Sequence, residues 1–134
     1  MGNTPSTQPT DGEFEILLVL WEKGPSTVRV INESLNKKRP ESAKEIGYTT
    51  TLKLMQIMAE KGLLSRSKSG KTHIYKPEID QSETQQRLVN KLMDKAFQGS
   101  AMKLVQQALG NRETSTQELD EIRKFLDELE EGKK

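Results

Sequence analysis

The chain contains no cysteine, one histidine and one tryptophan among its 134 residues. The absence of cysteine excludes disulfides, thiolate metal sites and a nucleophilic thiol. The single histidine, His73, cannot supply the usual histidine pair of a zinc enzyme. No run of about 18 apolar residues marks a membrane span, and residues 1–10 lack the basic and hydrophobic regions of a signal peptide. We therefore expect a cytoplasmic protein without a metal or cofactor.

Hydrophobic residues are also few, at 32%, whereas charged residues make up 31% of the chain. This composition leaves little material for a large buried catalytic cleft. The sequence shows no phosphate-cradling glycine loop and no paired-histidine zinc motif. We also find no set of serine, histidine and aspartate that the single histidine could complete as a catalytic triad in a pocket. We therefore do not expect an enzyme.

The net charge is only +1, but the charges are unevenly distributed along the chain. Residues 61–77 hold five basic side chains and no acidic one, whereas residues 118–131 hold seven acidic and two basic side chains. The first of these segments is suited to contact an anion such as nucleic acid, and the second is not.

Residues 1–10 are polar and without periodicity, which predicts a disordered tail. Two amphipathic helices should follow, separated by Gly24-Pro25. The first is expected from Glu13 to Glu22, with Asp11 as N-cap, and the second begins after the capping pair Ser26-Thr27. Their predicted apolar faces are Phe14, Leu17, Leu18 and Trp21 in the first, and Val28, Ile31 and Leu35 in the second.

A third helix is predicted from Tyr48 to Lys61, and Gly62 suits the left-handed position just past its end. The periodicity then changes to two, with alternating segments on both sides of Ser69-Gly70, which is typical of a two-stranded hairpin. Three helices followed by a hairpin is the order of a winged helix-turn-helix. We therefore expect a mainly helical protein with one small hairpin, and a winged-helix DNA-binding domain over residues 11–78.

Residues 79–134 are predicted to be helical again, in three segments. Gln98-Gly99-Ser100 interrupts the first two, and Ser115 to Glu118 fits a capping box that opens the last. These helices have wide apolar faces, but about 50 residues that stand alone would bury too little surface to be stable. We therefore expect this region to form a homodimer. The residues predicted to lie in the dimer interface are Leu88, Leu92, Phe97, Leu104, Val105, Leu119, Ile122, Leu126 and Leu129.

The predicted third helix divides into an apolar face and a polar one. Leu52, Met55, Met58 and Ala59 should pack on the first two helices, which leaves Thr49, Thr50, Lys53, Gln56 and Glu60 exposed. Threonine and glutamine can contact base edges or phosphates, and a helix N-terminus attracts phosphate. The alternative is an ordinary solvated helix face.

The predicted hairpin adds a second candidate contact. It carries Arg66, Lys68, Lys71 and Lys76 beside the Ser69-Gly70 turn, and such cations can reach a phosphate backbone. The alternative is protection of an exposed strand edge, for which lysine is commonly used. The order of the helix and the hairpin favours DNA binding over both alternatives. His73, on the second strand, is expected to be a half-exposed residue or to assist in a phosphate contact.

Three segments carry a resemblance to a known family. They are LWEKGPSTV at the first interhelical turn, Tyr48-Thr49-Thr50 at the start of the third helix, and Glu60-Lys61-Gly62-Leu63 before the hairpin. In these segments, and in order over residues 13–130, the chain resembles the penicillinase-repressor family, the BlaI, MecI and CopY group of bacterial winged-helix regulators.

The resemblance implies a homodimeric transcriptional repressor of a dyad-symmetric operator. In that family the third helix enters the major groove, which carries over onto Tyr48, Thr49, Thr50 and Lys53, and the wing contact carries over onto Lys68, Ser69, Gly70 and Lys71. The resemblance further implies relief of repression by a membrane metallopeptidase sensor, whose signal leads to cleavage in the C-terminal part. Gln107 and Ala108 occupy the aligned cleavage region.

The chain departs from the family pattern at specific positions. Family members commonly have threonine where Lys53 stands and arginine where Ile57 stands, so their operator sequence cannot be transferred to this chain. Copper-responsive members carry a C-terminal Cys-x-Cys pair, and the lack of cysteine excludes copper sensing by that route.

Two hypotheses for function follow. The first is a dimeric DNA-binding repressor. The second is a winged-helix module for protein–protein interaction without sequence-specific DNA binding, in which the third helix and the hairpin bind a protein. Binding that does not depend on salt, with no retention of DNA, would favour the second.

Overall fold

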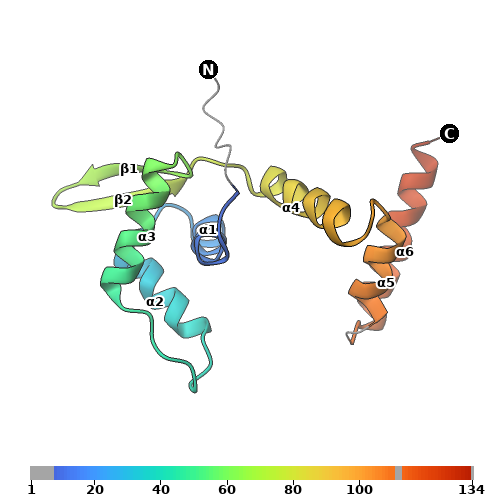
Figure 1. Cartoon of the computed structure of the whole chain (residues 1–134), viewed down its shortest axis with the longest axis horizontal. Helices are drawn as coiled ribbons and strands as arrows, with labels where there is room; N and C mark the ends of the chain where they lie inside the picture. The colour runs from blue at the N-terminus through green and yellow to red at the C-terminus, as the bar shows by residue number, and fades with distance from the viewer. Residues whose placement is uncertain (1–7, 111–112, 134) are drawn as a thin grey trace. The chain divides into compact units, whose positions relative to one another are not determined.

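The computed structural model of the chain describes residues 8–110 and 113–133. The predicted disordered tail therefore lies largely outside the described residues. The described part is mainly helical with one antiparallel hairpin, as predicted, and Figure 1 labels its elements. In chain order these are α1 (Asp11–Lys23), α2 (Val28–Lys38), α3 (Tyr48–Glu60), β1 (Leu64–Ser69), β2 (Thr72–Pro77), α4 (Gln81–Ala96), α5 (Ala101–Gly110) and α6 (Thr116–Glu131).

The chain divides into two compact units, Met1–Gln85 and Gln86–Lys134. The first unit holds α1, α2, α3 and the hairpin. The division falls within α4, so most of that helix belongs to the second unit together with α5 and α6.

The start of α1 differs from the prediction. Thr10, not Asp11, is the N-cap: its hydroxyl accepts from the Glu13 amide at 3.2 Å, and the Glu13 carboxylate accepts from the Thr10 amide at 3.0 Å. This reciprocal capping box satisfies two amides that the helix cannot. Thr27 caps α2 as predicted, with its hydroxyl accepting from the Val30 amide.

The core of the first unit lies where α1, α2, α3 and the base of the hairpin meet. The face of α1 that enters it differs from the predicted stripe, because Leu18 is 37% exposed. Trp21 lies at the edge, where its indole donates to the Ile79 carbonyl at 3.2 Å. The buried apolar residues are Ile16, Leu17, Val19, Leu20, Val28, Ile31, Leu35, Met55, Met58, Leu63, Leu64 and Tyr75.

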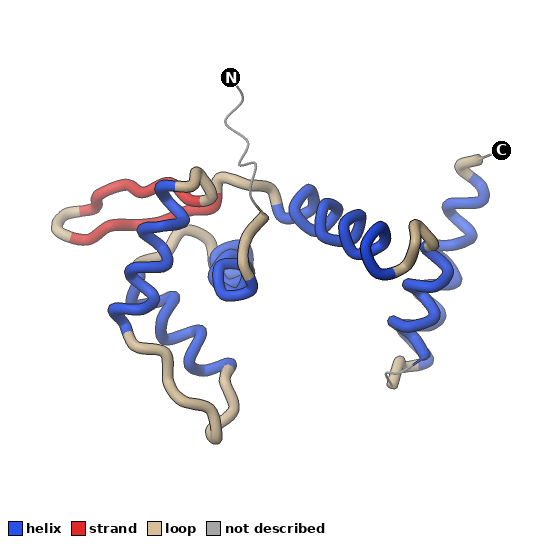
Figure 2. The backbone as a smooth tube through the Cα atoms, viewed as in Figure 1, coloured by secondary structure: helices blue, strands red, loops and turns tan. Residues whose placement is uncertain are grey.

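The hairpin is fixed at its base and free at its tip, where Figure 2 shows its short turn. Ser69 pairs with Thr72, so the turn is Gly70-Lys71, and Gly70 has the positive φ of 64° that such a turn requires. At the base, Ser26 and Tyr75 exchange two backbone hydrogen bonds of 3.0 and 2.9 Å. The connection between α1 and α2 thus forms an isolated β-bridge to β2 that holds the hairpin against the helices.

The second unit has little core of its own. Among the described residues, α5 and α6 contain no buried side chain, and the one buried residue of α4 is Thr84, in the first unit. Large apolar side chains are exposed by 40–63% on all three helices: Val89, Leu92, Met102, Val105, Phe125, Leu126 and Leu129. None of the helices in the described ranges is long and apolar enough to cross a bilayer.

Candidate nucleic-acid interface

The exposed face of α3 presents all five residues predicted for recognition. The N-cap is Gly47, which offers no side-chain hydrogen bond, so the amides of the first turn remain available to an outside acceptor. No acidic residue lies in that turn. The exposed residues are Tyr48, which is 50% exposed, then Thr49, Thr50, Lys53 and Gln56.

The opposite face of α3 is fixed by packing and by a buried hydroxyl. Met55 and Met58 are fully buried, as predicted, but Thr51 is also 0% exposed, which the apolar pattern did not predict. Asn32 of α2 donates to the Thr51 hydroxyl at 2.9 Å, so this polar group is satisfied in the core.

The loop before α3 is attached to α2 by asparagine side chains. The Asn36 amide donates to the Ile46 carbonyl at 3.0 Å and its oxygen accepts from the Ile46 amide at 2.8 Å. Asn32 also donates to the Ile46 carbonyl, at 2.9 Å. These hydrogen bonds hold Ile46 two positions before α3. They therefore fix the orientation of the helix that exposes the residues predicted for recognition.

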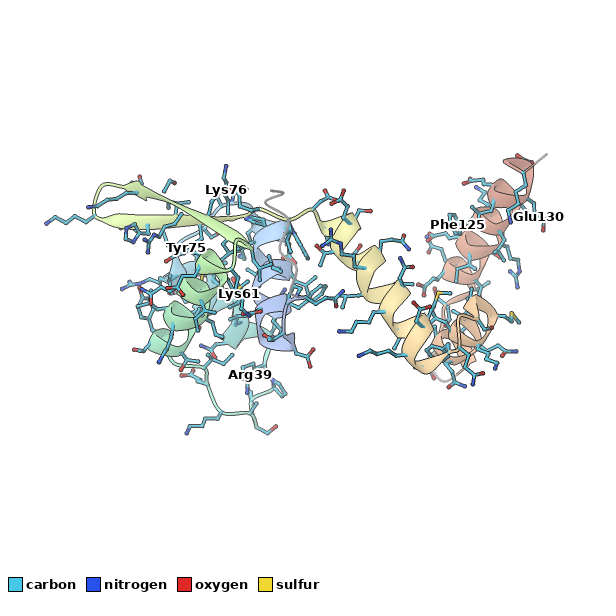
Figure 3. All side chains as sticks on the ribbon, turned by 45° about the horizontal axis from the view of Figure 1, so that its top comes forward. Arg39, Lys61, Tyr75, Lys76, Phe125 and Glu130 are labelled. Atoms are coloured by element: carbon cyan, nitrogen blue, oxygen red, sulfur yellow. The ribbon has the colours of Figure 1, made fainter. Side chains whose placement is uncertain are left out.

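The other end of α3 is tied to α1 by an ion pair. The Lys61 ammonium, labelled in Figure 3, lies 2.8 Å from the Glu13 carboxylate, whose side chain is only 3% exposed. Burial raises the pKa of Glu13, but hydrogen bonds from Lys61 and Thr10 outweigh burial and hold that pKa below its ordinary value of 4.5. Glu13 is therefore charged at neutral pH, and its carboxylate both caps the N-terminus of α1 and forms the ion pair that holds the end of α3 against α1.

The hairpin tip brings the predicted wing residues together. Arg66, Lys68, Ser69, Gly70 and Lys71 are all exposed, and Lys68 lies directly opposite His73 across the strands. No carboxylate occurs between residues 61 and 77 to offset these charges. His73 lies exposed on β2, opposite Lys68.

A cleft of about 460 Å³ lies between α2, α3 and the hairpin. It contains one predicted recognition residue, Tyr48, and one predicted wing residue, Lys71. It also contains Arg29, which the sequence analysis did not select. One local signal pointed to it, since an arginine in the first turn of a helix is unfavourable to the helix dipole. The complete lining is Thr27, Val28, Arg29, Tyr48, Leu52, Lys71, Thr72, His73 and Tyr75.

The residues predicted for dimerisation all lie on α4, α5 and α6 or directly after α4. Leu92, Val105, Leu126 and Leu129 are 44–52% exposed, and the remaining ones are partly buried: Leu88, Phe97, Leu104, Leu119 and Ile122. Gln107 and Ala108, in the predicted cleavage region, are exposed and lie inside α5. Within the described ranges, no group of three or more acidic or histidine side chains is arranged to hold a metal ion.

The comparison with protein families is decisive for identity. The family model described as penicillinase repressor matches residues 9–128 of this chain. The chain belongs to the penicillinase repressor family. The resemblance inferred from the three sequence segments is thereby confirmed.

Individual members of the penicillinase repressor family are similar to this chain over nearly its whole length. The penicillinase repressor of Bacillus licheniformis is 28% identical over 127 residues, covering 95% of each chain. The transcriptional regulator BlaI of Mycobacterium tuberculosis is 29% identical and covers 94% of this chain and 88% of its own. The solution structure of the DNA-binding domain of the repressor BlaI has a TM-score of 0.49 and 24% identity, over 62% of this chain and 93% of that domain.

Proposed function

We propose that this chain is a DNA-binding transcriptional repressor that binds a dyad-symmetric operator as a homodimer. The observation that carries the proposal is the exposed, acid-free N-terminal half of α3 beside a hairpin tip with uncompensated positive charge. Membership of a family whose members are named repressors supports it. The proposed activity is binding rather than catalysis, and the proposed location is the cytoplasm.

The exposed face of α3 and the basic hairpin tip have different roles in this proposal. Tyr48, Thr49, Thr50, Lys53 and Gln56 enter the major groove, where threonine and glutamine contact base edges. The hairpin tip contacts the phosphate backbone, and each phosphate that it neutralises releases counterions. Base readout therefore rests on α3, and salt dependence rests largely on the hairpin.

The exposed apolar residues of the second unit support a homodimer as the binding species. A helical segment of about 50 residues with little core needs a partner surface, and a two-fold dimer is the commonest solution. Two copies of α3 would then occupy successive major grooves, about 34 Å apart. Because the dimer binds both half-sites at once, its affinity for the operator is well above that of one copy for one half-site.

Relief of repression would follow from loss of the second unit. Cleavage near Gln107 and Ala108 by a pathway that starts at a membrane metallopeptidase sensor would separate the dimer region from the DNA-binding unit. Because these residues lie within α5, the helix must unwind locally before a protease can bind that segment in extended form.

Fluorescence anisotropy tests the proposal directly. The full chain is titrated into its own upstream promoter DNA and into scrambled DNA, at two salt concentrations. We expect tighter binding to the promoter and a steep loss of affinity with salt. No binding to either DNA near 0.15 M salt would refute the repressor and favour a protein-binding module.

Two variants separate the roles of the helix and the hairpin. We expect Thr50→Ala to lose about 1 kcal/mol on the promoter and less on scrambled DNA, because base contacts are sequence-specific. Lys71→Ala should weaken both complexes equally and reduce the salt slope by about 1. Equal losses on both DNAs for Thr50→Ala would contradict its role in base readout.

A further inference from the structure

The cleft between α2, α3 and the hairpin has the composition of an anion site. Arg29 and Lys71 bring positive charge to it from two different elements, and His73 adds an imidazole. No aspartate or glutamate lines it. Val28 and Leu52 form apolar lining, which lowers the screening of the cations by water.

The backbone of α2 adds donors to the same place. Thr27 and Val28 line the cleft, so the helix N-terminus opens into it. The Thr27 hydroxyl satisfies the Val30 amide and the Thr27 carbonyl accepts from Ile31, whereas the first amides of a helix have no carbonyl partner within it. Residues 28 and 29 therefore present amides and the positive end of the helix dipole to an anion.

Tyr75 is a further residue of the hairpin that lines the cleft. It is 0% exposed, and within the described part of the chain its hydroxyl is a buried side-chain oxygen without a hydrogen-bond partner. Tyr75 and His73 are two residues apart on β2 and so lie on the same face of the hairpin, the face that lines the cleft. The hydroxyl itself is shielded from solvent, so it is not a direct ligand for an anion in the cleft, and the contacts to such an anion come from Arg29, Lys71 and the N-terminus of α2.

We propose that this cleft binds a phosphate group, with Arg29, Lys71 and the N-terminus of α2 as its principal contacts. This phosphate group can come from two sources. The first is a phosphodiester of the operator backbone, and for this source the inference rests on the proposed function. Tyr48 on α3 and Lys71 at the hairpin tip both line the cleft, so a DNA strand that passes between these two contacts runs over it. Free phosphate, inorganic or on a small metabolite, has the same chemistry and is the second source.

The first experiment tests the site without DNA. Inorganic phosphate is titrated into the full-length protein against chloride at equal ionic strength, and backbone amides are followed by NMR. We expect saturable shifts at the amides of Val28, Arg29 and Lys71. Arg29→Gln should weaken this binding about five- to tenfold, because it removes a charge-assisted contact. Arg87→Gln, an exposed arginine of α4 outside the cleft, is the matched control and should leave the titration unchanged.

The second experiment identifies the source of the phosphate. Operator duplexes carry single neutral methylphosphonates, one position at a time, and each is bound by wild type and by Arg29→Gln. If the cleft holds a backbone phosphate, one position exists at which Arg29→Gln loses nothing further, although it loses about five- to tenfold on unmodified DNA. Arg87→Gln should show no such position.

Each outcome has a defined meaning. One coupled position supports a DNA phosphate, whether or not free phosphate produces saturable shifts. Saturable shifts without any coupled position support a site for free phosphate and refute the DNA source. If neither saturable shifts nor a coupled position is found, the proposed site is refuted. If Thr50→Ala still weakens operator binding in that case, the proposed function remains. If wild type binds no DNA, the proposed function fails and the phosphate titration alone decides the cleft.

Discussion

The ion pair between Lys61 and Glu13 should be necessary for the stability of the first unit. We predict that Lys61→Met destabilises the protein by about 2 kcal/mol at neutral pH. Methionine keeps much of the aliphatic length of lysine but leaves the carboxylate of Glu13, 3% exposed, with no cation beside it. The Thr10 amide would remain as its partner at 3.0 Å.

The magnitude follows from the burial of the two partners. Removal of one member of a fully buried ion pair costs about 3–5 kcal/mol, because the other charge stays buried and uncompensated. The Lys61 side chain is 32% exposed, so water already screens part of the attraction and the loss should be smaller. A loss of about 2 kcal/mol is a large share of the 5–15 kcal/mol typical of a domain.

The effect should depend on pH in one direction. The pKa of Glu13 lies below 4.5 in the folded protein, so the unfolded chain binds this proton more readily. The stabilisation is therefore complete above about pH 4.5 and is lost as the pH falls through the folded-state pKa. In Lys61→Met the burial that raises this pKa acts without the cation, so the difference between the two proteins should shrink on acidification.

Urea unfolding at fixed protein concentration, at pH 7 and at pH 3.5, measures this difference. Lys76→Met is the matched control, since Lys76 is an exposed lysine of β2 with no ion pair among the described residues. A loss below about 0.5 kcal/mol at pH 7, or one that is the same at both pH values, would refute the reasoning.

Three further predictions concern other parts of the chain. Asn36→Ala should lower the free energy of unfolding by about 2 kcal/mol, because it removes both hydrogen bonds to Ile46; an unchanged urea midpoint would contradict this. Tyr75→Phe should keep or raise the melting temperature of the free protein, since it deletes a buried hydroxyl without a partner, and a drop of several degrees would show an undetected bond. Leu126→Asp should weaken self-association at least tenfold in sedimentation, through a charge on an apolar helix face; an unaltered dimer would place the interface elsewhere.

Local signals in the sequence were sufficient for much of the fold. Thr27 followed by Val28, Ile31 and Leu35 at helical spacing predicted both the cap and the buried face of α2. A glycine between two segments of period two located the hairpin turn to within one residue, since Gly70 takes the left-handed conformation there. In both cases the decisive information lay within a few residues of the feature.

The predicted face of α1 was wrong at Leu18, for a reason that lies outside the helix, whereas Leu17 is buried as predicted. Its segment from residue 14 to 21 is apolar at nearly every position, so the spacing offers several stripes of similar quality. Packing against α2, α3 and the hairpin selected the one with Ile16, Leu17 and Leu20 and left Leu18 exposed. The cap was different: Thr10 with Glu13 three residues later is a capping box that the sequence already contained.

The sequence predicted the exposed residues of the candidate site but not the cleft between them. The exposed residues of α3 and of the hairpin tip follow from periodicity, because each depends on one element. The cleft depends on three elements that are separated by about twenty residues each, so Arg29 and Tyr75 were not recognised as its members. The burial of Thr51 was not predicted for the same reason, because its hydroxyl is satisfied by Asn32 of another helix.

The division of the hairpin into a fixed base and a free tip determines how this surface can change during evolution. Substitutions at the exposed positions 66–73 disturb no buried side chain, whereas Tyr75 combines the pairing with Ser26 and a place in the core. A library randomised at the tip should therefore yield mostly folded proteins, and one randomised at the base should not. Duplicated copies of such a gene can therefore diverge at the hairpin tip while they retain one shared architecture.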